Sequence, residues 1–249
     1  MTPCGESIEV MNGCLTGRRA LVTGGTRGIG AAISARLVSD GAAVTVTGRR
    51  LKAEAPQGCI YRPVDFSDRT AMDRFTEDVQ CLDFDILVNN AGVNKIGPFS
   101  GVAVEDFDLI QQVNLRAPFL LCQAVLPGMR KKKWGRIVNI SSIFGKISKE
   151  LRGPYSASKF ALDGMTVALA AEVAEDGIVV NCVAPGYIHT EMTRTILGEK
   201  GIEEIAAFVP MKRLGTPQEV AALVAWLVSP ENTYLTGQNI AIDGGFSRV

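Results

Sequence analysis

Seven short apolar runs alternate along this chain with longer amphipathic segments, and this alternation restricts the fold more than any other feature of the sequence. The runs have the length of buried strands, and the segments between them have the length and apolar spacing of helices. Strands that alternate with helices form right-handed βαβ units, which build a parallel sheet covered on both faces. We therefore expect an α/β fold, a Rossmann-like doubly wound seven-stranded parallel sheet with helices on both faces. The expected strands span residues 20–23, 43–47, 60–64, 86–89, 137–141, 179–184 and 238–242.

Two of the intervening segments carry a clear helical pattern. The first has Ile29, Ile33 and Leu37 at a spacing of four, and the stretch 107–126 is long and mostly apolar on one side. Ligands of doubly wound sheets bind at the carboxyl ends of the strands, where the strand order reverses. We therefore expect the functional residues just after a strand or on the helix that follows it.

Length and charge limit the domain count and the partners. With 249 residues and 47% hydrophobic content, the chain can bury the core of one large domain, which we expect over residues 16–249 after a flexible extension at 1–15. Lys+Arg and Asp+Glu both total 26, so no overall field attracts nucleic acid or an anionic membrane. No apolar run reaches the roughly 18 residues of a membrane span. The six cysteines form no Cys-x-x-Cys pair, which favours reduced thiols in the cytoplasm and no metal site.

Three glycines, Gly24, Gly28 and Gly30, follow the first expected strand and open the first expected helix. Missing side chains at these positions allow backbone amides and a helix N-terminus to approach a pyrophosphate. The spacing is one residue longer than the common dinucleotide fingerprint, and glycine clusters also form ordinary turns. Their placement between a strand and a helix favours a dinucleotide site.

The second expected strand ends in Thr47-Gly48-Arg49-Arg50, without the acidic residue that would bind an adenosine ribose. Arg49 and Arg27 are suited to a 2′-phosphate, because guanidinium makes bidentate contacts with phosphate. This pattern favours NADP(H) over NAD(H), although arginines are common on any surface.

Two further polar positions follow strands and have open interpretations. Asp65 is placed either to accept a hydrogen bond from the adenine amine or to cap a helix together with Ser67. The small residues of Asn89-Asn90-Ala91-Gly92 suit contact with the adenosine side of the cofactor, bracing of the sheet, or a structural turn.

Tyr155 and Lys159 lie four apart at the start of an Ala-rich amphipathic segment, so a helix places both on one face. A neighbouring cation favours the phenolate, and we expect it to lower the pKa of the tyrosine toward the range useful for proton transfer. An isolated pair of this kind is usually a surface contact. Here a buried strand ending before Ser142 precedes it, and Asn114 is a polar residue within an apolar helix. Hydrogen bonding to neighbouring backbone is the alternative role for both Ser142 and Asn114.

Together these motifs resemble those of the short-chain dehydrogenase/reductase family, in its single-domain form, over nearly the full length of the chain. The nearest general resemblance is to 3-oxoacyl-[acyl-carrier-protein] reductases, with sugar and secondary-alcohol dehydrogenases close behind. The resemblance implies that Tyr155 exchanges a proton with the substrate oxygen, that Ser142 binds this oxygen, and that Lys159 lowers the tyrosine pKa and holds the nicotinamide ribose. It also implies that Asn114 holds a water linked to Lys159. The motifs that carry it are residues 23–30, 89–92, 113–115, 142, 155–159 and 185–190.

The resemblance also assigns residues to the cofactor. In relatives, the backbone N–H at Ile188 and the hydroxyl of Thr190 bind the nicotinamide carboxamide, and Pro185-Gly186 brings the chain beside it. His189 in the same loop is assigned no role, because a lone loop histidine is usually solvated. The expected cofactor-binding residues are Gly24, Thr26, Arg27, Gly28, Ile29, Gly30, Arg49, Asp65, Phe66, Asn90, Ala91, Gly92, Tyr155, Lys159, Pro185, Gly186, Ile188 and Thr190.

The segment near 190–212 is expected to cover the substrate as a lid, as in relatives. Its apolar residues suggest an apolar substrate, or else simple packing on the body of the domain. We expect NADPH-dependent reduction of a ketone, a 3-oxoacyl-type or similar apolar carbonyl, to a secondary alcohol. The alternatives are an NAD-dependent dehydrogenase that oxidises a secondary alcohol, sugar or cyclic diol, and a non-catalytic dinucleotide-binding protein.

The expected partners are a small-molecule carbonyl or alcohol and further copies of this chain. Docking of an acyl-carrier protein requires basic residues near the active-site mouth. Lys133 and its neighbours offer such a patch, whereas Glu175-Asp176 have the wrong sign. Relatives form tetramers through the long helices around 107–126 and 155–175 and through the C-terminal segment, so we expect a homotetramer.

Overall fold

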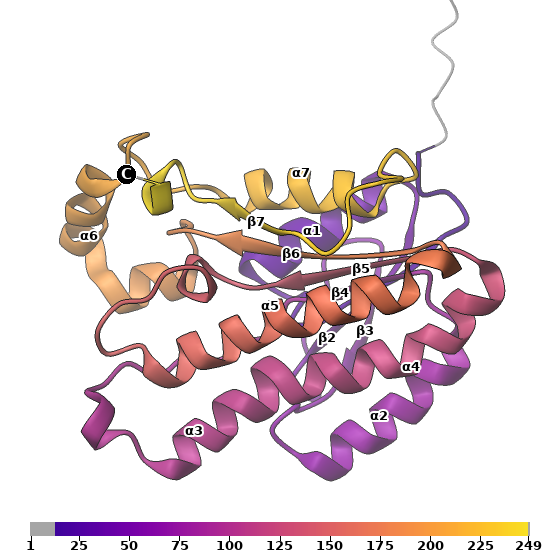
Figure 1. The fold of residues 1–249 in the computed structure, drawn as a ribbon, viewed down its shortest axis with the longest axis horizontal. Helices are drawn as coiled ribbons and strands as arrows, with labels where there is room; N and C mark the ends of the chain where they lie inside the picture. The colour runs from indigo at the N-terminus through magenta and orange to yellow at the C-terminus, as the bar shows by residue number, and fades with distance from the viewer. Residues whose placement is uncertain (1–12, 249) are drawn as a thin grey trace, which may run out of the picture.

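The sheet has the expected architecture in the computed structural model of the chain, which describes residues 13–248. Its strands lie in the order β3-β2-β1-β4-β5-β6-β7, and every neighbouring pair runs parallel (Figure 1). The sequence order reverses between β1 and β4, which makes their carboxyl ends the switch point of the sheet. The expected doubly wound seven-stranded fold is confirmed. The strands are β1 (Arg19–Val22), β2 (Ala43–Gly48), β3 (Cys59–Pro63), β4 (Ile86–Asn89), β5 (Gly135–Ile140), β6 (Ile178–Pro185) and β7 (Asn239–Ile242).

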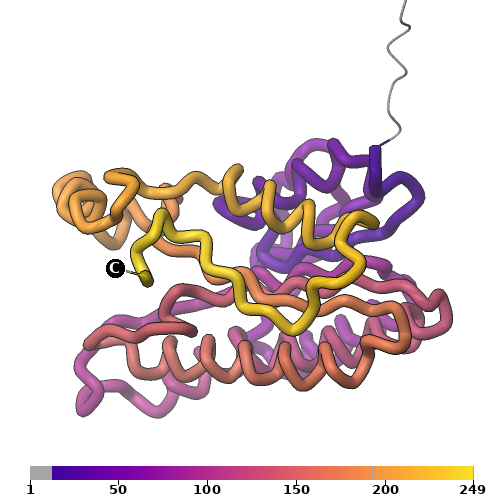
Figure 2. Tube along the Cα trace, turned by 45° about the horizontal axis from the view of Figure 1, so that its top comes forward, coloured from indigo at the N-terminus to yellow at the C-terminus, as the bar shows by residue number. Residues whose placement is uncertain are grey.

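Helices cover both faces of the sheet (Figure 1). One face carries α1 (Gly28–Ser39) and α7 (Pro217–Val228). The opposite face carries α2 (Arg69–Leu82), α3 (Val104–Gln111), α4 (Ala117–Lys132) and α5 (Gly153–Val173). Helix α6 (Glu191–Phe208) stands apart at one end, near the C-terminal segment (Figure 2). The short turns are η1 (Phe99–Gly101), η2 (Gln112–Arg116), η3 (Ile143–Gly145), η4 (Ala174–Asp176) and η5 (Phe246–Arg248).

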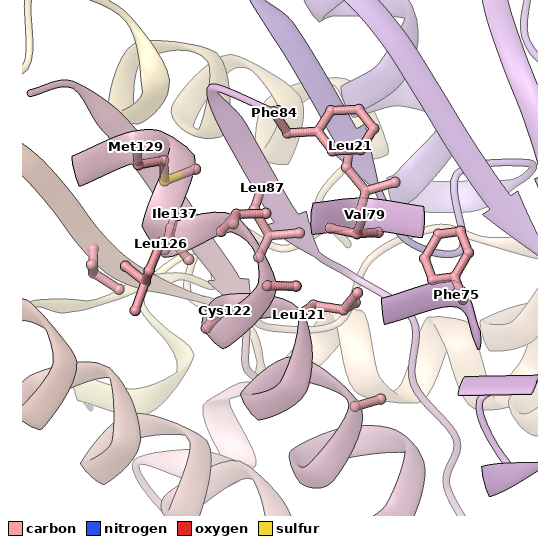
Figure 3. Close-up of a cluster of buried hydrophobic side chains, with 14 of the residues drawn as sticks. Leu21, Phe75, Val79, Phe84, Leu87, Leu121, Cys122, Leu126, Met129 and Ile137 are labelled. Carbon is pink, nitrogen blue, oxygen red and sulfur yellow. The ribbon is translucent and has the colours of Figure 1, made fainter. Parts of the chain in front are cut away.

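The core consists of two apolar layers, one on each face of the sheet, because a buried strand directs alternate side chains to opposite faces. In β1, Leu21 belongs to the layer under α2, α4 and α5, whereas Ala20 and Val22 belong to the layer under α1 and α7. Figure 3 shows the first layer, to which Leu87 of β4 and Leu121 of α4 contribute. Burial of each such leucine stabilises the fold by about 1.5–3 kcal/mol.

The long apolar stretch 107–126 is interrupted where one continuous helical pattern was expected. Helix α3 ends at Gln111, the turn η2 is π-helical, and α4 continues from Ala117. Pro118 explains the interruption, because it has no N–H to donate to the carbonyl of Asn114, four residues earlier. Such π-turns are frequent at functional sites, and this one contains Asn114.

Two further expectations concern the N-terminal extension and membrane-spanning helices. The expected extension 1–15 lies outside the described residues except for positions 13–15, where Leu15 is fully buried in the layer under α1 and α7. Within the described part of the chain, no helix combines the length and the apolarity needed to cross a membrane.

Candidate active site

The candidate residues gather at the carboxyl edge of the sheet, because parallel strands end at the same edge. Strands β1, β4, β5 and β6 all end there, and each is followed directly by one of the expected motifs. A Cβ added at Gly92 would lie 3.4 Å from Oδ1 of Asn114 and 3.8 Å from Nζ of Lys159. The loop after β4, the π-turn and α5 therefore meet at one point.

The turn after β1 is closed so tightly that only glycine fits at Gly30. A Cβ there would lie 2.3 Å from the carbonyl oxygen of Gly24 and 2.5 Å from Nδ2 of Asn90. Gly24 and Gly28 have φ values of +62° and +55°, in the left-handed region that favours glycine. Helix α1 begins at Gly28 with no side-chain cap from Arg27, which leaves N–H groups of its first turn without a helical partner. These residues fit the pyrophosphate of a dinucleotide.

Three polar side chains hold this turn in place. Asn90 Nδ2 donates to the carbonyl oxygens of Thr23 at 2.9 Å and Gly24 at 3.1 Å, and Thr23 Oγ1 accepts from the N–H groups of Asn90 and Ala91, both at 2.9 Å. Thr47 Oγ1 accepts from Gly24 N at 3.2 Å. The bracing interpretation of Asn90 is confirmed. Neither Thr23 nor Thr47 was among the expected site residues, although both stand at the ends of expected strands, where a hydroxyl meets the next loop.

The two arginines expected at a 2′-phosphate lie on either side of this turn. Arg49 directly follows β2 and is exposed. Arg27 precedes α1, and its Nη1 lies 3.6 Å from Oε2 of Glu191 at the start of α6, with both side chains largely exposed. An exposed pair of this kind is weak, so Arg27 is easily drawn to another anion.

Asp65 forms a local turn. Its Oδ1 accepts from the N–H of Ser67 at 2.9 Å and from Ser67 Oγ at 2.6 Å. Burial works to raise the pKa of Asp65, but the hydrogen bonds from Ser67 and the charge of Arg49 hold it below its ordinary value. The suggestion that Asp65 caps the next helix is wrong, because Asp68 caps α2 and accepts from Thr70 N and Ala71 N.

Four other expected cofactor residues have part of their side chains in the body of the domain. Phe66 is buried and packs edge-to-face against Phe75, with ring centroids 6.1 Å apart. Ala91 packs on the layer under α2, α4 and α5, and Ile29 on the layer under α1 and α7. Thr26 is half-buried. Any contact of Phe66, Ala91 or Ile29 with a cofactor therefore involves mainly their backbone.

Asn114 is fully engaged by protein atoms. Its Oδ1 accepts from Val93 N at 2.8 Å, and its Nδ2 donates to Val93 O at 2.9 Å and to Ser158 Oγ at 3.1 Å. The alternative of a buried asparagine satisfied by neighbouring backbone is thus confirmed for its side chain. The side chain of Asn114 thereby ties the loop after β4 to α5 at Ser158, the residue before Lys159.

Tyr155 and Ser142 form the centre of the site. The Ser142 hydroxyl lies near enough to the Tyr155 hydroxyl to oppose the rise of its pKa, and Ser142 Oγ accepts from Phe144 N at 3.1 Å. Ser142 caps the turn η3 and is 8% exposed, so it combines the expected structural role with contact to the tyrosine. A carbonyl oxygen placed near both hydroxyls would find two hydrogen-bond donors.

The expected lowering of the tyrosine pKa does not occur in this structure. Burial raises the pKa of Tyr155, against the opposing effects of the Ser142 hydroxyl and the Arg152 charge. Lys159 Nζ lies 5.7 Å from the centroid of the tyrosine ring and donates to the carbonyl oxygen of Ile140 at 2.8 Å. The phenol consequently keeps its proton, because desolvation of the phenolate outweighs the effects of Ser142 and Arg152.

Burial also shifts the pKa of Lys159, in the direction opposite to that of Tyr155. It is 4% exposed, and burial lowers the pKa of its ammonium to about 8. The group is therefore mainly charged at neutral pH and loses its charge under mildly alkaline conditions.

The loop after β6 is held between the C-terminal segment and α6. Gly186 has no room for a side chain, since a Cβ would lie 2.7 Å from Cβ of Asp243. Ile188 is buried, and Thr190 Oγ1 caps α6 by accepting from Thr193 N at 3.2 Å. The hydroxyl of Thr190, expected at a carboxamide, thus has a structural partner. His189 is exposed.

Helix α6 and the segment directly after it leave apolar side chains exposed. Ile196, Phe208 and Met211 are 47%, 77% and 58% exposed. The helix is kinked at Gly198, whose φ of +66° is non-helical. Val209 and Leu214, after the helix, are buried and anchor the segment to the domain.

The basic run near Lys133 is neutralised and lies at the wrong edge of the sheet for a docking patch. Lys133 Nζ and Arg130 Nε lie 2.6 Å and 3.0 Å from the carboxylate of Asp176, and Arg130 Nη2 lies 2.8 Å from Glu172. These residues adjoin the start of β5, whereas Ser142 follows its end. The suggestion that this run faces the active-site mouth is therefore wrong.

Arg152, which was not among the expected site residues, occupies the N-cap position of α5, three positions before Tyr155. Its guanidinium carbon lies 5.4 Å from the ring centroid of Phe144. Phe144 packs edge-to-face on Tyr187, which packs in the same way on Phe246. The signal was present in the sequence, because positions three apart share one side of a helical turn.

Known proteins resemble the chain over almost all of its length. The family model described as enoyl-(acyl carrier protein) reductase matches residues 24–247. The 3-oxoacyl-[acyl-carrier-protein] reductase of Aquifex aeolicus is 40% identical over 243 residues, which cover 93% of this chain and 98% of the relative. Acetoacetyl-CoA reductase of Cupriavidus necator is 38% identical over 247 residues, covering 93% and 98%. The structure of a gluconate 5-dehydrogenase from Burkholderia cenocepacia with NADP and tartrate superposes with a TM-score of 0.88 at 28% identity, covering 96% and 98%.

Proposed function

Because the chain belongs to the short-chain dehydrogenase/reductase family of NAD(P)-dependent oxidoreductases, which act on alcohol or carbonyl groups, we propose that it reduces a ketone to a secondary alcohol with NADPH. The observation that carries the proposal is the meeting of Tyr155, Ser142 and Lys159 beside a glycine turn that fits a dinucleotide. Burial raises the pKa of Tyr155, so the phenol carries the proton that a reduction would consume. Two relatives are named as reductases of acetoacetyl-CoA and of a 3-oxoacyl carrier protein.

Each side chain of the site has a role in proton transfer. Tyr155 donates its proton to the substrate carbonyl oxygen as that oxygen becomes an alcohol. Ser142 donates a hydrogen bond to the same oxygen and stabilises its developing negative charge. Lys159, charged below its pKa of about 8, stabilises the phenolate that the transfer leaves on Tyr155 and holds the ribose hydroxyls. NADPH, when bound, supplies the hydride.

We assign the cofactor to the carboxyl edge, with its pyrophosphate at the N-terminus of α1 and its 2′-phosphate at Arg49 and Arg27. The exposure of Arg49 directly after β2 and the weak partner of Arg27 support this assignment. The backbone at Asp65, Phe66 and residues 90–92 borders the adenosine side, and residues 185–190 border the nicotinamide side.

Fluorescence titration with NADPH and NADH in parallel tests the cofactor assignment. Wild-type protein is expected to bind NADPH at least tenfold more tightly than NADH, because a hydrogen-bonded phosphate contact contributes about 1.5–3 kcal/mol. Arg49→Asp should reverse this order, and Arg74→Asp, an exposed change on α2, should leave it intact. Tighter binding of NADH by the wild type would refute the assignment.

A second function, oxidation of a secondary alcohol such as a sugar acid, is favoured by the likeness to a gluconate 5-dehydrogenase. The same residues serve both directions, since Tyr155 accepts in oxidation the proton that it donates in reduction. The two functions are separated by the ratio of reductive to oxidative turnover at neutral pH.

We propose that α6 and the segment after it, residues 190–212, close over the substrate as the lid of a single domain. The exposed apolar residues Ile196, Phe208 and Met211 support this role, because a bound substrate would cover them. The substrate is proposed to be a free small molecule. The ion pairs of Arg130 and Lys133 leave little positive charge at this run for an acidic carrier protein.

We also propose that the chain assembles as a homotetramer through α4 and α5. Phe119, Phe160 and Val167 are 46%, 46% and 51% exposed on these helices. Phe119 also borders a cavity of about 430 Å³, whose lining consists of Gln111, Leu115, Arg116, Phe119, Ala161 and Met165. Apolar side chains grouped around a cavity are typical of a surface that another subunit covers.

A further inference from the structure

Arg152 holds a positive charge at the start of α5, next to the first turn that contains Tyr155. It is the N-cap residue of α5, and Tyr155 lies three positions later in the first turn. Its charge works to lower the pKa of Tyr155 and of Tyr187, and at Tyr187 the charge of Glu150 acts in the opposite sense. The guanidinium thus stands over the ring of Phe144, two residues after Ser142, at the start of the turn that carries Tyr155.

The rings next to Arg152 support the guanidinium without using its donors. The guanidinium carbon lies 5.4 Å from the ring centroid of Phe144. The ring centroids of Phe144 and Tyr187 are 6.3 Å apart, and those of Tyr187 and Phe246 are 5.4 Å apart. An aromatic face attracts the cation through its π-system and leaves the five N–H groups free. The three aromatic rings thus form an apolar surface, and the guanidinium of Arg152 lies at the end next to Phe144.

No carboxylate among residues 13–248 lies within the 4.0 Å ion-pair distance of this guanidinium. The nearest acidic residue in sequence, Glu150, is 74% exposed and lies 3.8 Å from Lys149 Nζ. Within the described structure, Arg152 also makes no side-chain hydrogen bond as a helix cap. A charge this close to the reacting centre thus has free donors for a ligand.

The backbone before Arg152 is held in a strained conformation. Leu151 has φ of +65°, a left-handed value that disfavours a branched side chain. Its carbonyl oxygen accepts from the N–H of Gly97 at 3.2 Å, which links this turn to the loop after β4. Strain of this kind persists where the surrounding contacts impose it, and it is common at ligand-binding positions.

We propose that Arg152 binds an anionic group of the substrate, a carboxylate or a phosphate, and so selects oxo acids and hydroxy acids over their neutral counterparts. The inference rests on the proposed function, because it names the substrate class of the same site. Arg152 acts here as a specificity-determining residue, since guanidinium pairs with both anions through parallel N–H bonds.

The test compares substrates that share the reacting ketone and differ in whether they carry an anionic group. Acetoacetate and methyl acetoacetate share the reacting ketone, and dihydroxyacetone phosphate and dihydroxyacetone form the corresponding phosphate pair. Wild-type protein should reduce the anionic member of at least one pair with a kcat/KM about 10- to 100-fold higher, mainly through KM, as expected for a charged hydrogen bond. The pair that shows the preference identifies the anion.

Variants at Arg152 separate a role in binding from a role in structure. Arg152→Gln should abolish the preference by raising KM for the anionic member, while the neutral member changes less than about twofold. Arg152→Lys should restore part of the preference, and Arg74→Gln on α2 should change nothing. Equal losses on both members, together with an alkaline shift of the pH profile, would show that Arg152 acts on Tyr155 instead and would overturn the proposal.

A binding measurement tests the role of Arg152 independently of turnover. The complex with NADPH is titrated with each member of a pair, and quenching of the nicotinamide fluorescence is followed. Binding of the anionic member that is lost in Arg152→Gln supports the proposal even where no reduction occurs, and in that case only the proposed function fails. Binding of neither member, or of both equally, overturns the role of Arg152.

Discussion

Among single residues, burial changes the two titratable groups of the site in opposite directions. It raises the pKa of Tyr155 and lowers the pKa of Lys159 to about 8, because desolvation disfavours the charged form of each. The neutral phenol is therefore favoured as the proton donor, and the charge of Lys159 is the feature most sensitive to pH.

The reductive activity should fall above a pH of about 8. Tyr155 stays protonated beyond this pH because its pKa is raised, whereas Lys159 has a lowered pKa and holds its proton only below about 8. The value of kcat/KM for reduction should be constant from pH 6 to about 7.5 and then decrease toward tenfold per pH unit. A pH–rate profile measures this, and a constant rate up to pH 10 would contradict the role given to Lys159.

The sequence predicted which residues meet in the site better than it predicted their states. Spacing placed Tyr155 and Lys159 on one helical face and Ser142 at a strand end, and the structure brings these three together. It did not predict the direction of the tyrosine pKa, because burial depends on segments distant in sequence. Nor could it show that Lys133 and Arg130 are neutralised, since their partners Glu172 and Asp176 lie more than 40 positions away.

At the scale of elements, the glycine turn depends on the contact between the ends of β1 and β4. Asn90 bonds the carbonyls of Thr23 and Gly24, and Gly30 packs against the same atoms without a side chain. A change at Gly30 therefore disturbs both the strand ends and the start of α1.

Gly30→Ala should destabilise the protein and weaken cofactor binding together. The added Cβ meets backbone at 2.3 Å, and overpacking of this kind costs about 1–3 kcal/mol. NADPH should bind at least tenfold more weakly. Ala35→Gly, at an exposed position of the same helix, should cost about 1 kcal/mol and leave NADPH binding unchanged. Chemical unfolding and fluorescence titration measure both, and normal NADPH affinity in Gly30→Ala would exclude the assigned pyrophosphate site.

The elements themselves were largely predictable, because continuous apolar runs and helical periodicity are local signals. Each expected strand overlaps an observed one, and β4 coincides with the expected 86–89. The π-turn at 112–116 was not predicted, since the apolar pattern continues through it and only the missing donor of Pro118 marks it. The capping of α2 by Asp68 was missed for a related reason: two aspartates stand three apart, and only the chain path shows which one caps.

For the whole molecule, the two apolar layers account for the buried faces of the sheet, but not for the apolar residues outside α4 and α5. Phe119, Phe160 and Val167 remain about half exposed on these helices, and Phe119 also lines a cavity of about 430 Å³. A surface of this kind is stable in water when further copies of the chain cover it.

Phe119→Glu should dissociate the proposed tetramer. A carboxylate buried at an apolar interface is strongly unfavourable, so the assembly should break into dimers or into chains of 26.6 kDa. Sedimentation velocity measures the change, and Leu51→Glu, at a residue 87% exposed in the loop after β2, serves as the control. Wild-type protein that sediments as one chain would disprove the assembly.

The central claim is that Tyr155 donates the proton in an NADPH-dependent reduction, and single-turnover oxidation of bound NADPH by a ketone substrate tests it most directly. Tyr155→Phe removes only the hydroxyl, so NADPH affinity should stay within about twofold of the wild type. The rate of the chemical step should fall by a factor of about 10² to 10⁴, the usual contribution of general acid catalysis. A variant that oxidises NADPH as fast as the wild type would contradict the mechanism, because a group other than Tyr155 would then supply the proton.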